Sequence, residues 1–234
     1  MSTVLSSSRG ALIVLEGCDH SGKTTQCKKL VSALNEASIK AEFYRFPGKY
    51  IYINDLDSYH RGTRTTAIGE MISGYLGRQQ DIEDHAVHLL FSANRWELKP
   101  KMLRSLEDGT NLIVDRYAYS GVAFTAAKEG FDIDWCKQPD IGLPQPDAVF
   151  YLHLNPEVAA KRATFGGERY EQTDFQSRVS KNFDNLQDSH WTIVDADKTV
   201  EELHEDLLER VKDVINNIGN KPIGKLWTDK SFHY

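Results

Sequence analysis

A chain of 234 residues, 40% hydrophobic and 26% charged, is long enough to form one sizeable domain with a buried core. The formal net charge of −6 argues against broad binding of nucleic-acid phosphates, so we expect no nucleic-acid partner. No apolar run reaches the length of a membrane-spanning helix or a secretory signal, so we expect no membrane partner and a cytoplasmic location, with the nucleus open by diffusion.

Short β-branched runs alternate with longer segments of helical spacing along the chain. Five of these runs are expected strands, at residues 11–16, 41–46, 111–115, 148–154 and 192–195. Seven segments are expected helices, at residues 22–35, 67–76, 83–106, 117–129, 156–164, 175–186 and 200–218. Such an alternation predicts a single α/β domain over residues 1–234, with a parallel sheet covered by helices on both faces.

Two segments interrupt this alternation. Residues 48–63 form a long connection without a helical period, and residues 164–172 carry Gly166 and Gly167 among charged side chains. Long connections in compact domains tend to be functional, although a solvated surface loop is the alternative for each. The second segment suits a mobile charged lid over about residues 162–173.

Residues 17–24 read Gly-Cys-Asp-His-Ser-Gly-Lys-Thr, a complete G-x-x-x-x-G-K-[ST] motif between an expected strand and an expected helix. In this context successive backbone N–H groups and the helix N-terminus point at a bound phosphate. We expect Lys23 to reach the β- and γ-phosphates of ATP and Thr24 to hold Mg²⁺ through its hydroxyl. The expected ATP site comprises the residues of this loop and of the helix start: Gly17, His20, Ser21, Gly22, Lys23, Thr24 and Thr25.

The remaining motifs favour a kinase over a GTPase. A GTPase needs a D-x-x-G switch and an N-K-x-D motif that reads the base. The only D-x-x-G sequence, at residues 19–22, lies inside the phosphate-binding loop at residues 17–24 (the P-loop), and residues 220–223 lack the final Asp of N-K-x-D. Four arginines on separate segments supply the cations that phosphoryl transfer between two phosphate groups needs: Arg95, Arg116, Arg162 and Arg169. A surface role is the alternative for each, but Arg116 follows an expected strand directly, where open α/β sheets bind ligands.

At these residues the chain resembles eukaryotic thymidylate kinases, of the nucleoside monophosphate kinase family, along nearly its whole length. The matching segments are residues 9–24, 45–47, 83–85, 89–97, 115–124, 135–140 and 165–171. The resemblance implies the P-loop nucleoside monophosphate kinase fold, with a five-stranded parallel sheet, an acceptor-binding region over about residues 46–125 and a short lid. It also implies transfer of the γ-phosphoryl group of ATP to dTMP, giving dTDP for dTTP synthesis.

The resemblance further implies a role for each matched residue. Asp19 would bind the sugar 3′-hydroxyl, Phe91 would stack on thymine and Arg95 would read the base edge. The other implied acceptor-binding residues are Phe46 and Pro47 beside the base, Arg64 and Arg116 at the phosphate, and Ser120, Gly121, Tyr170 and Gln176 in the same pocket. Arg162 would lie against adenine, and Asp115 would approach Mg²⁺ through water. Catalysis would depend on Lys23, Asp19, Arg116 and Arg169.

Spacing agrees with the resemblance at Phe91 and Arg95. They are four residues apart, so they share one helix face and can meet one base. A core Phe beside an Arg that reaches solvent is the alternative. Their helix is apolar on more than one side and resembles the family's dimer-forming helix, which implies a homodimer.

Two features depart from the family pattern, and two rival functions stay open. His20 stands where many eukaryotic relatives have Arg, which puts a catalytic cation on the γ-phosphate in doubt. The chain also carries an insertion at about residues 49–63 that matches no family motif. One rival is a kinase of the same fold for UMP, CMP or dGMP. The other is a non-catalytic ATP-binding protein, against which the cations around a second phosphate argue.

Overall fold

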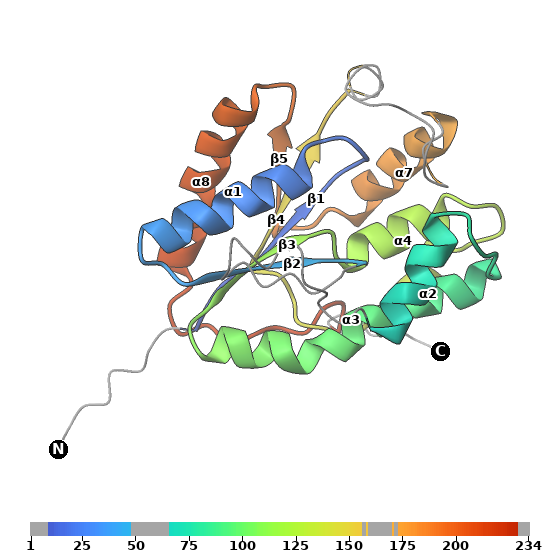
Figure 1. Ribbon diagram of the computed structural model, residues 1–234, viewed down its shortest axis with the longest axis horizontal. Helices are drawn as coiled ribbons and strands as arrows, with labels where there is room; N and C mark the ends of the chain where they lie inside the picture. The colour runs from blue at the N-terminus through green and yellow to red at the C-terminus, as the bar shows by residue number, and fades with distance from the viewer. Residues whose placement is uncertain (1–8, 48–65, 156–157, 159–169, 171–172, 229–234) are drawn as a thin grey trace.

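The computed structural model describes residues 9–47, 66–155, 158, 170 and 173–228 of the chain (Figure 1). Its centre is a sheet of five strands: β1 (Leu12–Glu16), β2 (Ala41–Arg45), β3 (Asn111–Asp115), β4 (Ala148–His153) and β5 (Trp191–Asp195). The strand order is β2-β3-β1-β4-β5, and every neighbouring pair is parallel. This confirms the expected five-stranded parallel sheet.

Six of the described helices correspond to predicted segments: α1 (Lys23–Glu36), α2 (Ala67–Leu76), α3 (Asp84–Glu107), α4 (Ala118–Ala126), α7 (Thr173–Leu186) and α8 (Val200–Asn217). Two short helices, α5 (Ile133–Lys137) and the 3-10 helix η2 (Gln138–Asp140), were not predicted. The prediction that α4 extends to residue 129 is wrong, because the chain turns after Ala126 and the amide of Lys128 bonds to the carbonyl of Thr125. The expected helix at residues 156–164 lies outside the described residues, apart from Val158.

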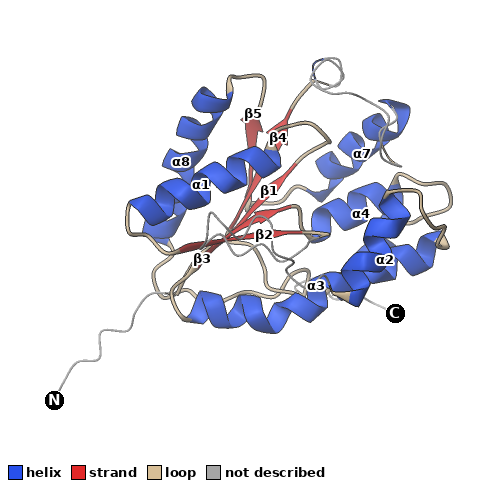
Figure 2. Ribbon diagram, viewed as in Figure 1, coloured by secondary structure: helices blue, strands red, loops and turns tan. Residues whose placement is uncertain are grey.

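Helices cover both faces of the sheet (Figure 2). On one face α1 and α8 pack over a core that includes Ile13 and Leu15. On the other face α3, α4 and α7 pack over a core that includes Leu12 and Val14. Every residue of β1 and β3 is buried, as expected for central strands of a parallel sheet. None of the helices in the described ranges is long and apolar enough to cross a bilayer.

The loops at the carboxyl ends of β1, β2 and β3 meet at one edge of the sheet. The loop after β1 needs glycine at its first position: Gly17 has φ 146°, and a Cβ atom there would lie 2.7 Å from the carbonyl oxygen of Leu152. Gly22, with φ 89°, then turns the chain into α1. Arg116 follows β3 directly, with its backbone in the left-handed region at φ 66°. This edge therefore gathers the residues predicted from the motifs.

Candidate active site

Lys23 lies at the start of α1 with its side chain turned back onto the P-loop. Its ammonium donates to the carbonyl oxygen of Cys18 (2.7 Å) and to Ser21 Oγ (3.1 Å). The side chain is buried, and burial together with the nearby charge of Arg116 lowers the pKa of Lys23 to about 8. The loop thus holds a cation beside the amides of a helix N-terminus, an arrangement suited to a polyphosphate.

Thr24 and Asp115 lie together between the P-loop and the end of β3. Thr24 Oγ1 donates to Asp115 Oδ2 at 2.5 Å, whereas Asp115 Oδ1 is buried and accepts no hydrogen bond within the described structure. A buried carboxylate oxygen that accepts no hydrogen bond is available to coordinate a cation. Mg²⁺ in phosphoryl-transfer sites is bound through one or two protein oxygens plus water and phosphate. This donor set therefore fits Mg²⁺, although the described residues contain no group of three or more Asp, Glu, His or Cys side chains that could hold a metal ion by themselves.

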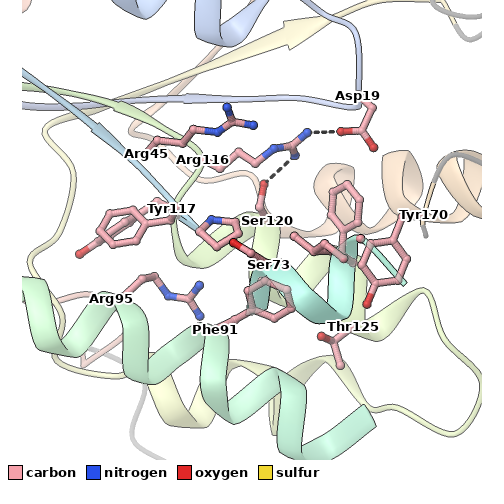
Figure 3. Close-up of a pocket in the computed structure, with 16 residues that line it drawn as sticks. Asp19, Arg45, Ser73, Phe91, Arg95, Arg116, Tyr117, Ser120, Thr125 and Tyr170 are labelled. Atoms are coloured by element: carbon pink, nitrogen blue, oxygen red, sulfur yellow. Dashed lines mark hydrogen bonds and ion pairs between the residues drawn. The ribbon is translucent and has the colours of Figure 1, made fainter. Parts of the chain in front are cut away.

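A cavity of about 410 Å³ opens beside the P-loop (Figure 3). Its walls come from the ends of β1 and β2, from α2, α3 and α4, and from Tyr170. Nine of the predicted acceptor-binding residues line it: Asp19, Phe46, Pro47, Phe91, Arg95, Arg116, Ser120, Gly121 and Tyr170. The described structure therefore brings into one pocket residues that the sequence separates by up to 151 positions, from Asp19 to Tyr170.

Arg116 and Asp19 form an ion pair at the end of this pocket nearest the P-loop (Figure 3). Arg116 Nη1 also donates to the carbonyl oxygen of Gly17 (3.2 Å) and to Ser120 Oγ (3.1 Å). The other oxygen of Asp19 accepts from Gln176 Nε2 at 2.8 Å. Burial raises the pKa of Asp19, but the charges of Arg116 and Lys23 outweigh it and hold the pKa below its usual value. Asp19 is therefore an ionised acceptor at neutral pH.

Phe91 and Arg95 extend from α3 into the opposite part of the pocket (Figure 3). The guanidinium of Arg95 is buried and forms a bidentate pair with Asp140, from Nε to Oδ1 (3.0 Å) and from Nη2 to Oδ2 (2.5 Å). An aromatic ring and a group with donors only thus face one cavity. The pair can hold a planar ring and bind an acceptor atom on its edge.

Comparisons with known proteins agree with this geometry. A family model described as thymidylate kinase matches residues 15–207. The thymidylate kinase of Danio rerio is 50% identical over 226 residues, covering 95% of this chain and 100% of the relative. The human thymidylate kinase is 50% identical over 222 residues, covering 94% and 98%. A solved structure of thymidylate kinase from Candida albicans has a TM-score of 0.78 and 35% identity, covering 93% and 98%.

The chain belongs to the thymidylate kinase family. Its match to the Candida albicans structure also fits the parallel α/β fold described above. In this family member, three of the predicted site residues, Arg64, Arg162 and Arg169, lie outside the described residues. So do the insertion at 49–63 and, apart from Tyr170 and Thr173, the lid at 162–173.

The prediction missed Glu16, the last residue of β1. Its carboxylate is fully buried and accepts hydrogen bonds from the amides of Tyr117 (2.8 Å) and Ser120 (3.1 Å) and from Ser120 Oγ (2.6 Å). These amides belong to the first turn of α4, whose own N-cap residue makes no side-chain hydrogen bond. Burial raises the pKa of Glu16. The only sequence signal was an acidic residue directly before the first glycine of the P-loop.

Among the lining residues of the cavity that the prediction also missed, two lie beside assigned residues. Arg45 ends β2, lines the cavity, and lies with its Nε 3.6 Å from Asp115 Oδ2 while its side chain is half exposed. Phe124, one turn after Ser120 on α4, places its ring 5.2 Å from the Arg116 guanidinium. Both belong to segments that matched the family, so their position beside assigned residues was the available signal.

Proposed function

We propose that the pocket binds dTMP while the P-loop binds ATP, so that the chain transfers the γ-phosphoryl group of ATP to dTMP and makes dTDP. Membership of the thymidylate kinase family supports this activity. The observation that carries the assignment of roles is that Asp19, Phe91, Arg95 and Arg116 line one cavity beside the P-loop. Together they offer a sugar acceptor, an aromatic platform, a base-edge donor and a phosphate cation.

On the acceptor side, Arg116 and Ser120 would hold the phosphate of dTMP, and the Asp19 carboxylate would accept from the sugar hydroxyl. The ion pair between Arg116 and Asp19 keeps both groups ordered before the nucleotide arrives. Arg45 adds a further cation at the same end of the pocket. Positioning and fixed positive charge account for most of the catalysis in phosphoryl transfer, so preordered cations suit this reaction.

On the donor side, Lys23 and the amides of the P-loop would hold the β- and γ-phosphates. Thr24 and Asp115 would hold Mg²⁺, which when bound neutralises charge on the phosphate oxygens. Both nucleotides can be bound at once, so the acceptor phosphate attacks in line and no covalent enzyme intermediate is required. Arg162 at adenine and Arg169 in the lid remain part of the proposal.

Turnover in a coupled assay with ATP and a panel of acceptors tests this proposal. We expect dTMP to have the highest kcat/KM among dTMP, dUMP, UMP, CMP and dGMP. The Candida albicans relative is described as having broad substrate specificity, so the panel also measures acceptor breadth. A clear preference for another nucleotide would favour the rival kinase, and no turnover on any acceptor would favour a non-catalytic ATP-binding protein.

We also propose a homodimer, formed through α3 and the adjacent α2, and a location in the cytoplasm with the nucleus open by diffusion. The dimer is supported by two exposed apolar side chains on neighbouring helices. Met71 on α2 and Leu89 on α3 expose 46% and 49% of their surface, and the two helices pack side by side. Sedimentation of the wild-type chain and of Leu89→Glu tests the dimer. A monomeric wild type would contradict the proposal, as would a Leu89→Glu chain with unchanged dimer stability.

A further inference from the structure

Asp140 is a fully buried carboxylate below the floor of the acceptor pocket. It comes from the 3-10 helix η2, and its only close cation in the described structure is Arg95, which is 2% exposed. Asp140 Oδ1 also lies 2.8 Å from Ser92 Oγ, one turn before Arg95 on α3. The Ser92 hydroxyl is in turn 2.9 Å from the carbonyl oxygen of Pro139. Because the fork of Arg95 is planar, two bonds to one carboxylate fix both the position and the plane of the guanidinium.

Gly121 of α4 fixes the same guanidinium from the other side. A Cβ atom at this position would lie 2.9 Å from Arg95 Nη2, 3.1 Å from Nη1 and 3.3 Å from Cζ. The guanidinium therefore packs directly on the helix backbone, where no other residue type leaves room for it. A flexible arginine end would normally move aside, but moving this one breaks its bonds to Asp140.

The donors that Arg95 has left determine what it can recognise. Asp140 accepts hydrogen bonds from Nε–H and from one N–H of Nη2. In the described structure, both N–H groups of Nη1 and the second N–H of Nη2 therefore remain available to donate to a ligand. Arginine has no acceptor atom and keeps its charge. A base held here must offer an acceptor on its edge. Thymine offers a carbonyl oxygen where cytosine carries an amino group, which would face Arg95 with donor against donor.

We propose that Asp140, Ser92 and Gly121 are positioning residues that set the preference for an oxo-pyrimidine over an amino-pyrimidine by fixing the guanidinium of Arg95. The inference rests on the proposed function, since it requires the acceptor base to lie against Arg95. None of the three residues needs to contact the base through its own polar side-chain atoms. Their effect on specificity is exerted through the position of one side chain.

The test measures kcat/KM for dTMP and dCMP in the wild type and in three variants. A site built around a hydrogen bond rejects an analogue that cannot make it by large factors, so we expect the wild type to favour dTMP by about 10³-fold or more. Gly121→Ala displaces the guanidinium while leaving Asp140 in place, and Ser92→Ala removes one bond that orients Asp140. For both we expect the ratio of kcat/KM for dTMP to that for dCMP to fall by about tenfold or more, with KM for ATP unchanged.

Asp140→Asn removes the counter-ion and is expected to reduce the ratio further. Because Asp140→Asn leaves the buried charge of Arg95 without its partner, the folding of this variant is checked by circular dichroism. If Asp140→Asn does not fold, the test is made with Gly121→Ala. Gly74→Ala on α2 and Ser105→Ala on α3 are matched controls, since neither residue lines the pocket, and their ratios should equal that of the wild type.

The outcomes separate the two proposals. If the wild type strongly favours dTMP and the variants lose activity on dTMP and dCMP by the same factor, the three residues are merely structural and the inference is wrong. If the wild type does not favour dTMP over dCMP, the proposed function fails first. A lowered ratio in Gly121→Ala and Ser92→Ala, with unchanged ratios in the two controls, supports the inference.

Discussion

The carboxylate of Glu16 accepts two hydrogen bonds from Ser120, one from its amide (3.1 Å) and one from its hydroxyl (2.6 Å). Ser120 Oγ in turn accepts from Arg116 Nη1. The end of β1 is thereby joined to the first turn of α4 and to Arg116, the arginine proposed to hold the acceptor phosphate. A carboxylate near a helix N-terminus is also favoured by the helix dipole. Glu16 thus fixes the geometry of Arg116 without lining the pocket itself.

We therefore predict that Glu16→Gln weakens acceptor binding. An amide has one acceptor oxygen, so it cannot satisfy the two amides and the Ser120 hydroxyl together. KM for dTMP should rise by about tenfold, in line with the loss of one or two buried hydrogen bonds, while KM for ATP changes little. Steady-state kinetics with each substrate varied in turn measures this. Glu107→Gln, an exposed residue at the end of α3, is the control, and equal changes in both KM values would contradict the prediction.

Lys23→Ala is predicted to abolish turnover while leaving the fold intact. The ammonium is needed on the transferring phosphoryl group, and removing a single preorganised donor of this kind costs about 10²–10³ in kcat. The far-ultraviolet circular dichroism spectrum should match the wild type. Lys40→Ala, an exposed lysine before β2, should retain full activity. Near-normal turnover of Lys23→Ala would remove the P-loop from the mechanism.

The lowered pKa of Lys23 predicts a pH dependence. Since this pKa is about 8 in the free protein, raising the pH above 8 removes the charge that attracts ATP. The kcat/KM for ATP should therefore fall above pH 8, because it reports groups of the free enzyme. Bound polyphosphate favours the ammonium, so the corresponding fall in kcat should occur at higher pH. A flat kcat/KM profile from pH 7 to about pH 9.5 would contradict this prediction.

The same shift has a consequence for stability. The folded state binds fewer protons at Lys23 than the unfolded state between its pKa of about 8 and the ordinary value of 10.5. The contribution of Lys23 to the free energy of unfolding should then increase as pH rises through this interval. Urea unfolding of the wild type and of Lys23→Met at several pH values isolates this contribution. A difference that does not vary between pH 8 and pH 10.5 would contradict the assignment.

Much of the fold was predictable because its elements are long and periodic. The buried run of β1 and the P-loop that follows it identified the centre of the sheet. In contrast, α5 is only five residues long, which is too short to show a helical period, and its first turn is capped by Asp132. The extension predicted for α4 was wrong for a tertiary reason. Lys128 leaves the helix and bonds to Asp84 (2.6 Å) and to the hydroxyl of Tyr75 (3.2 Å).

The site was predictable where a short sequence motif is sufficient to indicate the chemistry. A Gly-Lys-Thr sequence after a strand indicates phosphate binding on its own, whereas Glu16 and Asp140 act on residues 104 and 45 positions away. Neither the bond from Glu16 to Ser120 nor the pair of Asp140 with Arg95 has a local pattern. Both depend on which segments the sheet brings together, and this requires three-dimensional structure.

A preference of dTMP over dUMP is predicted to be modest. The two bases offer the same edge to Arg95 and differ by one methyl group, and a pocket that fills one methyl group discriminates by about 10–200-fold. Comparison of kcat/KM for dTMP and dUMP measures this. Equal values would indicate that the apolar wall of Phe46 and Pro47 does not contact the methyl group.

The last prediction concerns His20, at a position where the resemblance to eukaryotic thymidylate kinases implies an arginine in many members. A fixed guanidinium on the transferring group is worth about 10³–10⁵ in rate, and a histidine supplies full charge only when protonated. Either another cation acts on the γ-phosphate, for which Arg169 beside Gly166 and Gly167 is the candidate, or this enzyme is slower than its relatives. We favour the first hypothesis, because the lid sequence already carries an arginine.

Under this hypothesis Arg169→Ala should reduce kcat far more than His20→Ala, and His20→Arg should change kcat by less than about threefold. The backbone at His20 is in the left-handed region, with φ 62°, which histidine adopts more readily than arginine, so the folding of His20→Arg is checked by circular dichroism. Coupled assays at several pH values from about pH 6 to pH 8 provide the measurement. If His20→Arg instead raises kcat strongly and removes any loss of activity with rising pH, the second hypothesis holds. If His20→Ala is as inactive as Lys23→Ala, His20 is itself catalytic, because no other cation then acts on the γ-phosphate in its place.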